Sequence, residues 1–403
     1  MSLQLTPGDN LNVVIAANPL VTKYTLPIGT YYLDDILTIT RNNLSIIGLG
    51  KASETHIYQQ NVNRDGINIR ADSVVIKNVS VHVPHSKRVA LTVAGCNKSK
   101  VTKCYFYGSR DFFTIYYAGP PVKAGEATIN AYLSNQLDNR HNFSKNVVYA
   151  NYSGDAVSFS LQYDGRFVGN IIRGGKLAVY MCRDSQIDNN HIYDSNSHGI
   201  YVSLPSHNLT ISNNNMYECK NSSLIIKQQR EHTYLNGDAI PISDYNMTID
   251  GNCFYDNDYF GIEINEGQNI NITNNKFLHN EVRGLYLQSC SNIVIKDNIL
   301  SYFKIAIELL NISECQICNN TFYSVYPVAT EKGIILSTYV VNGVMGVNLN
   351  NTVSNNYFKG QITYPITVTD QKPDDTNIVA NNNYDQFYDY QEEIRLLKGI
   401  RIN

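Results

Sequence analysis

The sequence predicts an all-β solenoid, a coil of short strands that climbs in rungs of about 22 residues. The main evidence is a recurring phrase of one apolar residue, two spacers and an asparagine. Its copies end at Asn151, Asn170, Asn190, Asn214, Asn252, Asn275, Asn298, Asn320, Asn356 and Asn382. Most of these asparagines lie 19 to 26 residues apart, and the two longer intervals hold insertions. The repeat runs nearly end to end, so we expect one elongated domain of about 12 rungs.

A second phrase predicts the strands of each rung. A small residue and alternating apolar positions precede the asparagine phrase, as in Gly199-Ile200-Tyr201-Val202 and Gly284-Leu285-Tyr286-Leu287. Alternation with a period of two is typical of half-buried strands, and strands spaced this closely leave no room for helices between them.

The two phrases together closely resemble the right-handed parallel β-helix of the pectin lyase-like superfamily, over roughly residues 20 to 385. The resemblance implies three strands per rung and an internal asparagine ladder at one bend. Asparagine tolerates the left-handed conformation at such a bend, and its amide can pair with the asparagine one rung away. Cys104 takes the ladder position in one early rung, where we expect the ladder to be interrupted.

Both ends of the chain are expected to form caps, because an open solenoid end exposes apolar core and unpaired strand edges. Residues 1–22 are assigned to an N-terminal cap with a short helix over 8–18, capped by Asp9. Residues 23–385 form the β-helix, and its first rungs resemble those of phage tailspikes. Residues 386–403 are assigned to a C-terminal cap or oligomer contact, with a short helix that ends at Gly399.

Composition narrows the classes of partner. The net charge is −3, 17% of the residues are charged, and no long basic run occurs, so no nucleic-acid partner is expected. No stretch is long enough for a membrane span, and the N-terminus lacks the pattern of a secretory signal. The eight cysteines show no paired framework, and the lone Cys315-x-x-Cys318 is interpreted as interior. We expect no metal and no cofactor.

The same features predict a cytosolic, reduced product. Richness in asparagine, isoleucine and tyrosine without tryptophan suits an AT-rich genome, including many viral ones, so incorporation in a viral particle is a hypothesis. By resemblance to tailspikes we also expect a homotrimer.

Two insertions, at about 118–140 and 228–245, are expected to wall a groove. Its floor would carry the outward strand residues Ser158, Tyr180, Tyr201 and Ser203. We expect the two tyrosines at equivalent positions of adjacent rungs, about 4.8 Å apart. Aromatic faces beside hydroxyl groups suit sugar rings.

Ionisable residues near this groove are the catalytic candidates. Glycoside cleavage needs two carboxyl groups, whereas a polysaccharide lyase needs a base and a cation. The candidate catalytic residues are Asp155, Asp184, Glu231 and His198, and the candidate substrate-binding cations and histidine are Arg183, Arg230 and His232. A rival site has Glu263 and Glu308 at the same outward position two rungs apart, with Tyr286 between them.

The resemblance carries no catalytic motif with it. Ser197-His198-Gly199 matches only part of the Gly-His-Gly of polygalacturonases, and pectate lyases require a tryptophan that this chain lacks. Three hypotheses therefore stand: a tailspike-type β-helix that binds and cleaves a surface glycan, a conventional polysaccharide lyase, epimerase or hydrolase, and a structural spike without activity.

Overall fold

The computed structural model describes residues 1–83, 88–108, 113–120, 137–151, 155–204, 206–228, 234–235, 238–239, 246–301, 303–324, 332–338, 340–341, 344–369 and 376–385. The chain divides into two compact units, which we describe separately. Unit 1 comprises residues 1–210 and 229–242, and unit 2 comprises residues 211–228 and 243–403.

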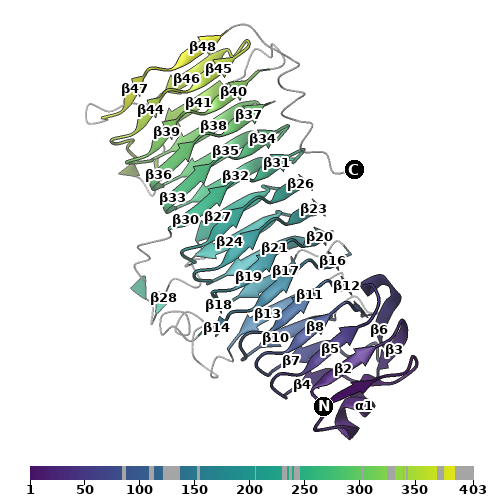
Figure 1. The fold of residues 1–403 in the computed structure, drawn as a ribbon. Coiled ribbons are helices and arrows are strands. Elements are labelled where there is room, and N and C mark those ends of the chain that lie inside the picture. The colour runs from purple at the N-terminus through teal and green to yellow at the C-terminus, as the bar shows by residue number, and fades with distance from the viewer. Residues whose placement is uncertain are drawn as a thin grey trace. The chain divides into compact units, whose positions relative to one another are not determined.

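Unit 1 is a parallel β-helix in which each rung contributes one strand to each of three sheets (Figure 1). Sheet A consists of β1 (Ser2–Gln4), β2 (Lys23–Leu26), β5 (Ser45–Gly48), β8 (Val75–Lys77), β11 (Lys100–Thr102), β15 (Asn142–Ser144), β19 (Arg166–Val168) and β22 (Gln186–Asp188). Sheet B consists of β3 (Gly29–Leu33), β6 (Thr55–Gln59), β9 (Ser80–His82), β12 (Tyr105–Tyr107), β16 (Val147–Tyr149), β20 (Ile171–Arg173) and β23 (His191–Ser195). Sheet C consists of β4 (Leu37–Ile39), β7 (Ile67–Ile69), β10 (Leu91–Ala94), β13 (Ile115–Gly119), β17 (Asp155–Ser160), β21 (Lys176–Tyr180) and β24 (Ile200–Leu204).

Unit 2 repeats the same order of strands. Its sheet A contains β30 (Met247–Asp250), β33 (Gln268–Thr273), β36 (Ser291–Lys296), β39 (Gln316–Cys318), β44 (Thr352–Ser354) and β47 (Ile378–Ala380). Its sheet B contains β26 (Asn215–Cys219), β31 (Cys253–Tyr255), β34 (Lys276–Leu278), β37 (Ile299–Ser301), β40 (Thr321–Tyr323), β45 (Tyr357–Lys359) and β48 (Asn383–Asp385). Its sheet C contains β27 (Leu224–Gln228), β32 (Phe260–Asn265), β35 (Arg283–Gln288), β38 (Ile305–Leu310), β41 (Lys332–Ser337) and β46 (Tyr364–Val368).

The smaller elements lie outside these sheets. They are α1 (Leu11–Ala17), the 3-10 helix η1 (Ala52–Glu54), and the two-stranded pairs β14 (Asp138–Asn139) with β18 (Gln162–Tyr163), β28 (Tyr234–Leu235) with β29 (Asp238–Ala239), and β42 (Val340–Val341) with β43 (Val344–Met345). β25 (Thr210–Ser212) contains the boundary between the units. Sheet C holds seven strands in unit 1 and six in unit 2, so the chain makes about 13 rungs, close to the number predicted.

Inward side chains of successive rungs stack into columns and form the core. In unit 1, Phe143 stacks on Phe167 with ring centroids 5.1 Å apart, and in unit 2 Phe254 stacks on Phe277 at 4.9 Å. Burial of each such ring contributes about 1.5 to 3 kcal/mol. The alternation read from the sequence therefore sets which residues face the core.

The asparagine ladder lies at the bend between sheets A and B, as the sequence predicts. In unit 2 each ladder amide donates to the next asparagine oxygen at 2.9–3.0 Å, along Asn214, Asn252, Asn275, Asn298, Asn320, Asn356 and Asn382. In unit 1 the amide of Asn146 donates to Asn170 at 3.2 Å, and that of Asn170 donates to Asn190 at 3.0 Å.

Two details of this bend differ from the prediction, and a third agrees with it. Asn151 was wrongly placed in the ladder: it is exposed, and Asn146 takes its place because Phe143 begins the phrase one strand earlier. The left-handed conformation belongs to the residue before each ladder asparagine, such as Asn274 with φ 55°. The interruption at Cys104 is confirmed, because this residue meets Asn146 only through its backbone N–H, at 2.9 Å.

The N-terminal helix forms, but its cap is one residue later than predicted. Asn10, not Asp9, accepts the backbone N–H groups of Asn12 and Val13, while Asp9 accepts that of Thr6. Arg41 holds the other end of α1 by donating to the carbonyl of Ile15. The predicted C-terminal helix and the centres of both insertions lie outside the described residues.

All eight cysteines are free, in agreement with the absence of a paired framework in the sequence. Cys315 is buried and Cys318 is partly buried, as expected for a strand inside the coil. Among the described residues, no helix has the length and apolar character needed to cross a membrane.

Candidate functional site

The outward face of sheet C in unit 1 contains the predicted groove floor, with a different register. Tyr201 pairs with Ala178, and Tyr180 pairs with Ser203, so the two tyrosines are not at equivalent positions as we predicted. Their rings still meet diagonally, with centroids 6.0 Å apart and planes tilted by 54°. Ser158 and Ser203 are buried, so neither hydroxyl lies on an open floor.

Three side chains gather around these two tyrosines. Lys176 Nζ lies 2.7 Å from Asp155 Oδ1, and the same ammonium group lies 5.2 Å from the centroid of the Tyr201 ring. The His198 ring is 5.9 Å from that of Tyr201. Tyr180 forms a side-chain hydrogen bond with Asp155. We call Asp155, Lys176, Tyr180, His198 and Tyr201 the sheet C cluster.

Burial raises the pKa of the Tyr180 hydroxyl, and the Asp155 carboxylate, the Tyr201 hydroxyl and the hydrogen bond to Asp155 raise it further. Tyr180 therefore keeps its proton at neutral pH, which makes it a hydrogen-bond donor and a possible general acid. The Lys176–Asp155 ion pair is only 18–20% exposed, so solvent screens it weakly.

The sequence interpretation selected four members of the cluster and missed Lys176. The strand alternation could have found it, since Lys176, Ala178 and Tyr180 share the outward face of β21. Asp184 is exposed on the bend after β21, where its Oδ1 accepts the amide of Asn208 at 2.7 Å. Arg183 lies on the same bend, partly buried. Glu231, Arg230 and His232 lie outside the described residues.

The rival site in unit 2 has the predicted register. Tyr286 pairs with Glu263 on one side and with Glu308 on the other, so the two carboxylates share one outward column. Adjacent rungs are about 4.8 Å apart, which places the two backbones about 10 Å apart.

Both carboxylates of this rival site are already engaged by neighbours. Glu263 accepts the Ser222 hydroxyl at 2.7 Å and the Asn265 amide at 3.0 Å. Glu308 forms an ion pair with Arg283, whose guanidinium lies 5.2 Å from the Tyr286 ring. Burial raises the pKa of Tyr286, with a further contribution from Glu308.

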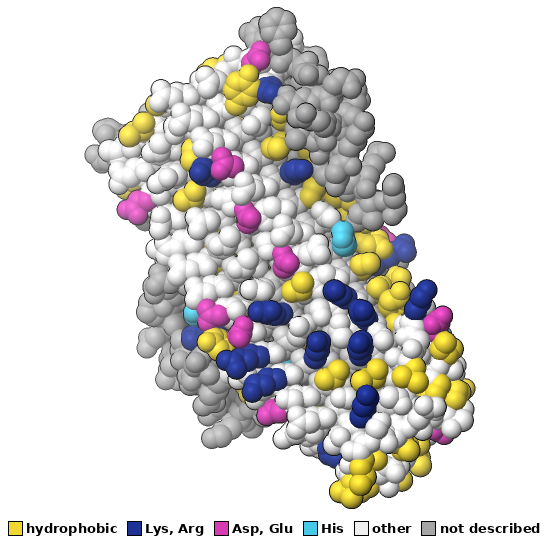
Figure 2. Space-filling model, in the orientation of Figure 1, with side chains coloured by type: hydrophobic (Ala, Val, Ile, Leu, Met, Phe, Trp, Pro, Cys, Tyr) yellow, Lys and Arg dark blue, Asp and Glu magenta, His cyan; other side chains and the backbone are white. Residues whose placement is uncertain are grey.

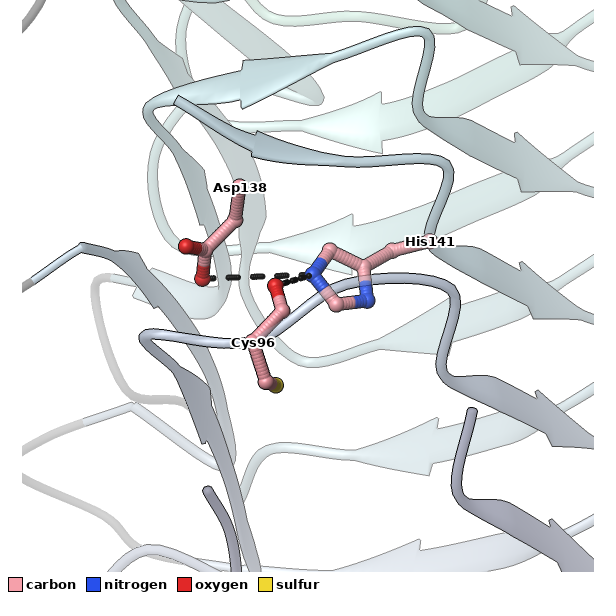
Figure 3. A group of neighbouring side chains, drawn as sticks. All are labelled: Cys96, Asp138 and His141. Atoms are coloured by element: carbon pink, nitrogen blue, oxygen red, sulfur yellow. Dashed lines mark hydrogen bonds and ion pairs between the residues drawn. The ribbon is translucent and has the colours of Figure 1, made fainter. Parts of the chain in front are cut away.

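One buried group of unit 1 has side chains that could hold a metal ion. Cys96, Asp138 and His141 place their ligand atoms within 4.8 Å of one another, and Asp138 Oδ2 is 3.9 Å from His141 Nε2 (Figure 3). His141, however, uses both ring nitrogens: Nδ1 accepts the backbone N–H of Ser99 at 3.2 Å, and Nε2 lies 2.9 Å from the Cys96 carbonyl.

In these contacts Nδ1 acts as an acceptor and Nε2 as a donor, and Nε2 is the nitrogen that faces Asp138. Burial and then the Asp138 charge raise the pKa of the Cys96 thiol to about 12, which keeps it protonated. Asp138 Oδ2 has no hydrogen-bond partner among the described residues. The contacts that the structure shows are structural: His141 links the start of sheet A at β15 to Ser99 and to the Cys96 carbonyl, one rung earlier.

Sheet B of unit 1 carries a feature that sequence reasoning missed. Tyr58, His82, Tyr107 and Tyr149 follow one another in register and stack with centroids 4.3, 4.4 and 5.0 Å apart. The stacked rings cover each other's faces and leave their edges outward. Beside the last two rings lies a cavity of about 400 Å³, lined by Tyr107, Gly108, Tyr149, Asn151, Arg173 and Gly174.

The sequence over residues 131–236 and 221–344 matches the family described as a right handed beta helix region, and this match spans more than half of the chain. The chain therefore belongs to that family. The three parallel sheets and the asparagine ladder confirm the resemblance to pectin lyase-like β-helices. A comparison with curated protein sequences finds no match.

Solved structures with this fold include carbohydrate-active enzymes. The catalytic domain of a GH87 α-1,3-glucanase in complex with tetrasaccharides is 12% identical, with 94% of this chain and 68% of that chain covered and a TM-score of 0.63. The A-module of the mannuronan C-5 epimerase AlgE4 from Azotobacter vinelandii is 15% identical, with 95% and 94% covered and a TM-score of 0.50. At these identities the likeness establishes the fold.

Proposed function

We propose that this protein binds a polysaccharide on the outward face of sheet C in unit 1 and acts on it by proton transfer, as a lyase or epimerase does. The observation that carries the proposal is the chain of contacts from Lys176 to Asp155 to Tyr180. It joins a cation, a carboxylate and a protonated phenol on one face, beside the rings of Tyr201 and His198.

Each member has a role that its surroundings support. Lysine can stabilise the charge that develops on a sugar carboxylate when the neighbouring carbon loses its proton. Histidine is the side chain best suited to accept that proton near neutral pH, which we assign to His198. Tyr180 remains protonated and can deliver a proton to the leaving oxygen or to the opposite face of the ring. Tyr201 offers an aromatic surface to the sugar.

Hydrolysis by two carboxylates suits this cluster less well, because Asp155 is its single described carboxylate and is paired with Lys176. The fold supports a polysaccharide ligand by analogy with the solved structures above, whose names specify a glucanase and a mannuronan epimerase. That analogy favours a polysaccharide ligand, but it assigns no role to any residue of this chain.

The test is a panel of acidic and neutral polysaccharides incubated with the full chain. Lyase action is read from the absorbance of unsaturated products, epimerisation from the NMR spectrum of the polymer, and hydrolysis from new reducing ends. Tyr180→Phe should reduce turnover by roughly 10²- to 10⁴-fold, the usual contribution of a general acid. The control is Tyr163→Phe, which removes an exposed tyrosine of β18 outside the cluster. Unchanged turnover in Tyr180→Phe would falsify the assignment.

A second candidate function is glycoside hydrolysis in unit 2, favoured by the shared column of Glu263 and Glu308. Their backbone separation is compatible with the roughly 6.5 to 9.5 Å between carboxyl groups of inverting glycosidases. Release of reducing ends that is lost in Glu263→Gln and kept in Tyr180→Phe would move the active site to this column.

The tailspike type of assembly is also part of the proposal. A homotrimer of the 45.4 kDa chain, as in a spike carried by a viral particle, would associate through outward faces, because each rung buries its own core. Light scattering at micromolar concentration should report the molar mass of three chains. A molar mass equal to that of one chain would contradict the trimer.

A further inference from the structure

Sheet A of unit 1 carries a dense group of positive side chains that are scattered in the sequence. We call Lys77, Lys98, Lys100, Lys103, Arg140, Lys145 and Arg166 the basic face. All are exposed except Lys77, which is partly buried. Figure 2 shows dark-blue side chains gathered over the region where Figure 1 labels β8, β11 and β19.

The register brings these residues together. Lys100 and Arg166 occupy one outward column, with Asn142 between them. Lys103 and Lys145 are adjacent on the bend that leaves sheet A, since the backbone N–H of Lys103 donates to the carbonyl of Ser144. With rungs about 4.8 Å apart, the cations form rows that run along the coil over several rungs.

Few of these positive charges are neutralised by acidic side chains of the same chain. Arg140 pairs with Asp164 at 3.4 Å, and the other six make no ion pair with any residue that the structure describes. A net charge of −3 for the whole chain therefore hides a strongly positive face. Such a face concentrates anions at its surface.

Four of these cationic residues have a backbone conformation that lysine and arginine rarely adopt. Lys98, Lys103, Arg140 and Lys145 have φ between 54° and 59°, the left-handed region that glycine and asparagine prefer. At the matching bends of unit 2 that the structure describes, the chain places mostly asparagine: Asn274, Asn319 and Asn355 before the ladder, and Asn292 and Asn350 before sheet A, with Gly251, Asp297 and Glu314 at other rungs and no lysine or arginine. Positive charge is therefore the property that distinguishes these four bends of unit 1 from the matching bends of unit 2.

We propose that the basic face binds a linear acidic polysaccharide, whose carboxylates lie along the rows of cations. Between the cations lie the partly buried outward side chains of Asn142 and Ser144, an amide and a hydroxyl group, which suit sugar hydroxyls. Single-stranded nucleic acid would use aromatic side chains for base stacking. The outward positions of β8, β11, β15 and β19 hold none.

This inference rests on the proposed function for the ligand class, a polysaccharide. It adds that the polysaccharide is anionic. It also assigns capture of the polymer to a face other than sheet C. Electrostatic capture of this kind weakens as salt rises, because exposed charges are screened beyond about 8 Å at physiological ionic strength.

The experiment compares two triple variants of the full chain. Lys98→Asn/Lys103→Asn/Lys145→Asn removes three charges from the basic face and installs the residue that unit 2 uses at the same bends. The matched control Lys51→Asn/Lys220→Asn/Lys304→Asn removes three exposed charges elsewhere. Binding of polygalacturonate is measured by titration calorimetry at low and physiological salt, with a neutral glucan and a single-stranded oligonucleotide as comparison ligands.

We expect the face variant to bind polygalacturonate roughly tenfold to a hundredfold more weakly, on the scale of about tenfold per one or two surface charges, and the control to bind like wild type. The thermal midpoint of the face variant should stay the same or rise. Equal weakening in both triples, or no binding of polygalacturonate by wild type, overturns the proposal. Oligonucleotide binding as tight as polygalacturonate binding overturns it in favour of a nucleic-acid face.

The two proposals fail separately. Loss of binding in the face variant while Tyr180→Phe retains turnover would sustain the basic face and reject the sheet C cluster. The reverse pattern, with turnover lost in Tyr180→Phe and binding intact in the face variant, would reject the basic face alone.

Discussion

Sheet A and its bends are built alike in units 1 and 2, yet their outward residues differ. In unit 1 the bend before the ladder includes Lys103 and Lys145, whereas in unit 2 it is mostly asparagine, as at Asn274, Asn319 and Asn355, with Gly251 and Asp297 in two rungs. The inward pattern is the same in both. The fold therefore requires apolar inward positions, whereas its bends accept side chains of different charge at the same backbone conformation.

The asparagine ladder also differs between the units, because it is interrupted at Cys104 in unit 1. Breaking the ladder in unit 2 should have the largest effect on the free energy of unfolding. Asn275→Leu removes the acceptor of the Asn252 backbone and amide N–H groups, and the donor to the Ile249 carbonyl. Because these groups are buried, we expect a loss of roughly 2 to 4 kcal/mol. Urea unfolding of the full chain measures it. Asn271→Leu, at an exposed position of β33, is the control, and an equal loss there would show that the ladder contributes nothing special.

The aromatic column of sheet B in unit 1 contains a histidine, His82, whose protonation should make the stability of the fold depend on pH. His82 is stacked between Tyr58 and Tyr107, and its partial burial, with a smaller contribution from His56 at 3.3 Å, lowers its pKa to about 4. In the unfolded chain the pKa is near 6.5. Between these values the unfolded state binds the extra proton, so stability is complete above about pH 6.5 and falls as the pH drops towards 4.

His82→Phe keeps the stack and removes this titration. Since His82 is partly exposed, we expect its contribution to be roughly 1 kcal/mol across the window. The measurement is the thermal midpoint of wild type and variant from pH 7.5 to 4. Identical pH profiles would show that the histidine does not titrate differently on folding.

Much of this architecture could be predicted from the sequence because it depends on local rules. The period, the inward residues and most ladder positions follow from alternation and from Asn chemistry. Register could not be predicted, since β17 contains an irregularity between Asp155 and Val157, and Ala178 stands outward rather than at the small inward position. That shift of two residues explains why Tyr180 and Tyr201 are diagonal.

The site was predicted only in part for a related reason. Asp155, Tyr180, His198 and Tyr201 were found because they lie in or beside the predicted strands. Lys176 shares the outward face of β21 with Tyr180, but the strand was predicted to begin at Ala178, so the lysine was left out. The basic face was missed because its residues lie up to 89 positions apart, from Lys77 to Arg166. The net charge of the whole chain, −3, gives no sign of them. A register is needed before such residues can be seen as neighbours.

Extending the short ladder of unit 1 should give a smaller, opposite effect. Cys104 occupies a ladder position, and its thiol already reaches towards the Ile76 carbonyl at 3.7 Å. In Cys104→Asn the amide can donate to that carbonyl and to Asn146, as Asn146 does to Val101 and Asn170. We expect a gain of about 0.5 to 1 kcal/mol, the net value of one hydrogen bond. A lower thermal midpoint would mean that the site cannot hold the larger side chain.

The smallest effect we predict comes from exchanging the residues that distinguish the two bends. Lys145→Asn in unit 1 should stabilise the chain, and Asn319→Lys in unit 2 should destabilise it, each by a few tenths of a kcal/mol, because asparagine is several-fold enriched over lysine in left-handed conformations. Both positions have φ near 57°, so the exchange changes the side chain and its charge while the backbone conformation stays the same. Thermal midpoints at high salt, where charge repulsion is screened, isolate the conformational contribution. If Lys145→Asn destabilised the chain under these conditions, the lysine would have a structural partner, and its place on the basic face would no longer need a ligand to explain it.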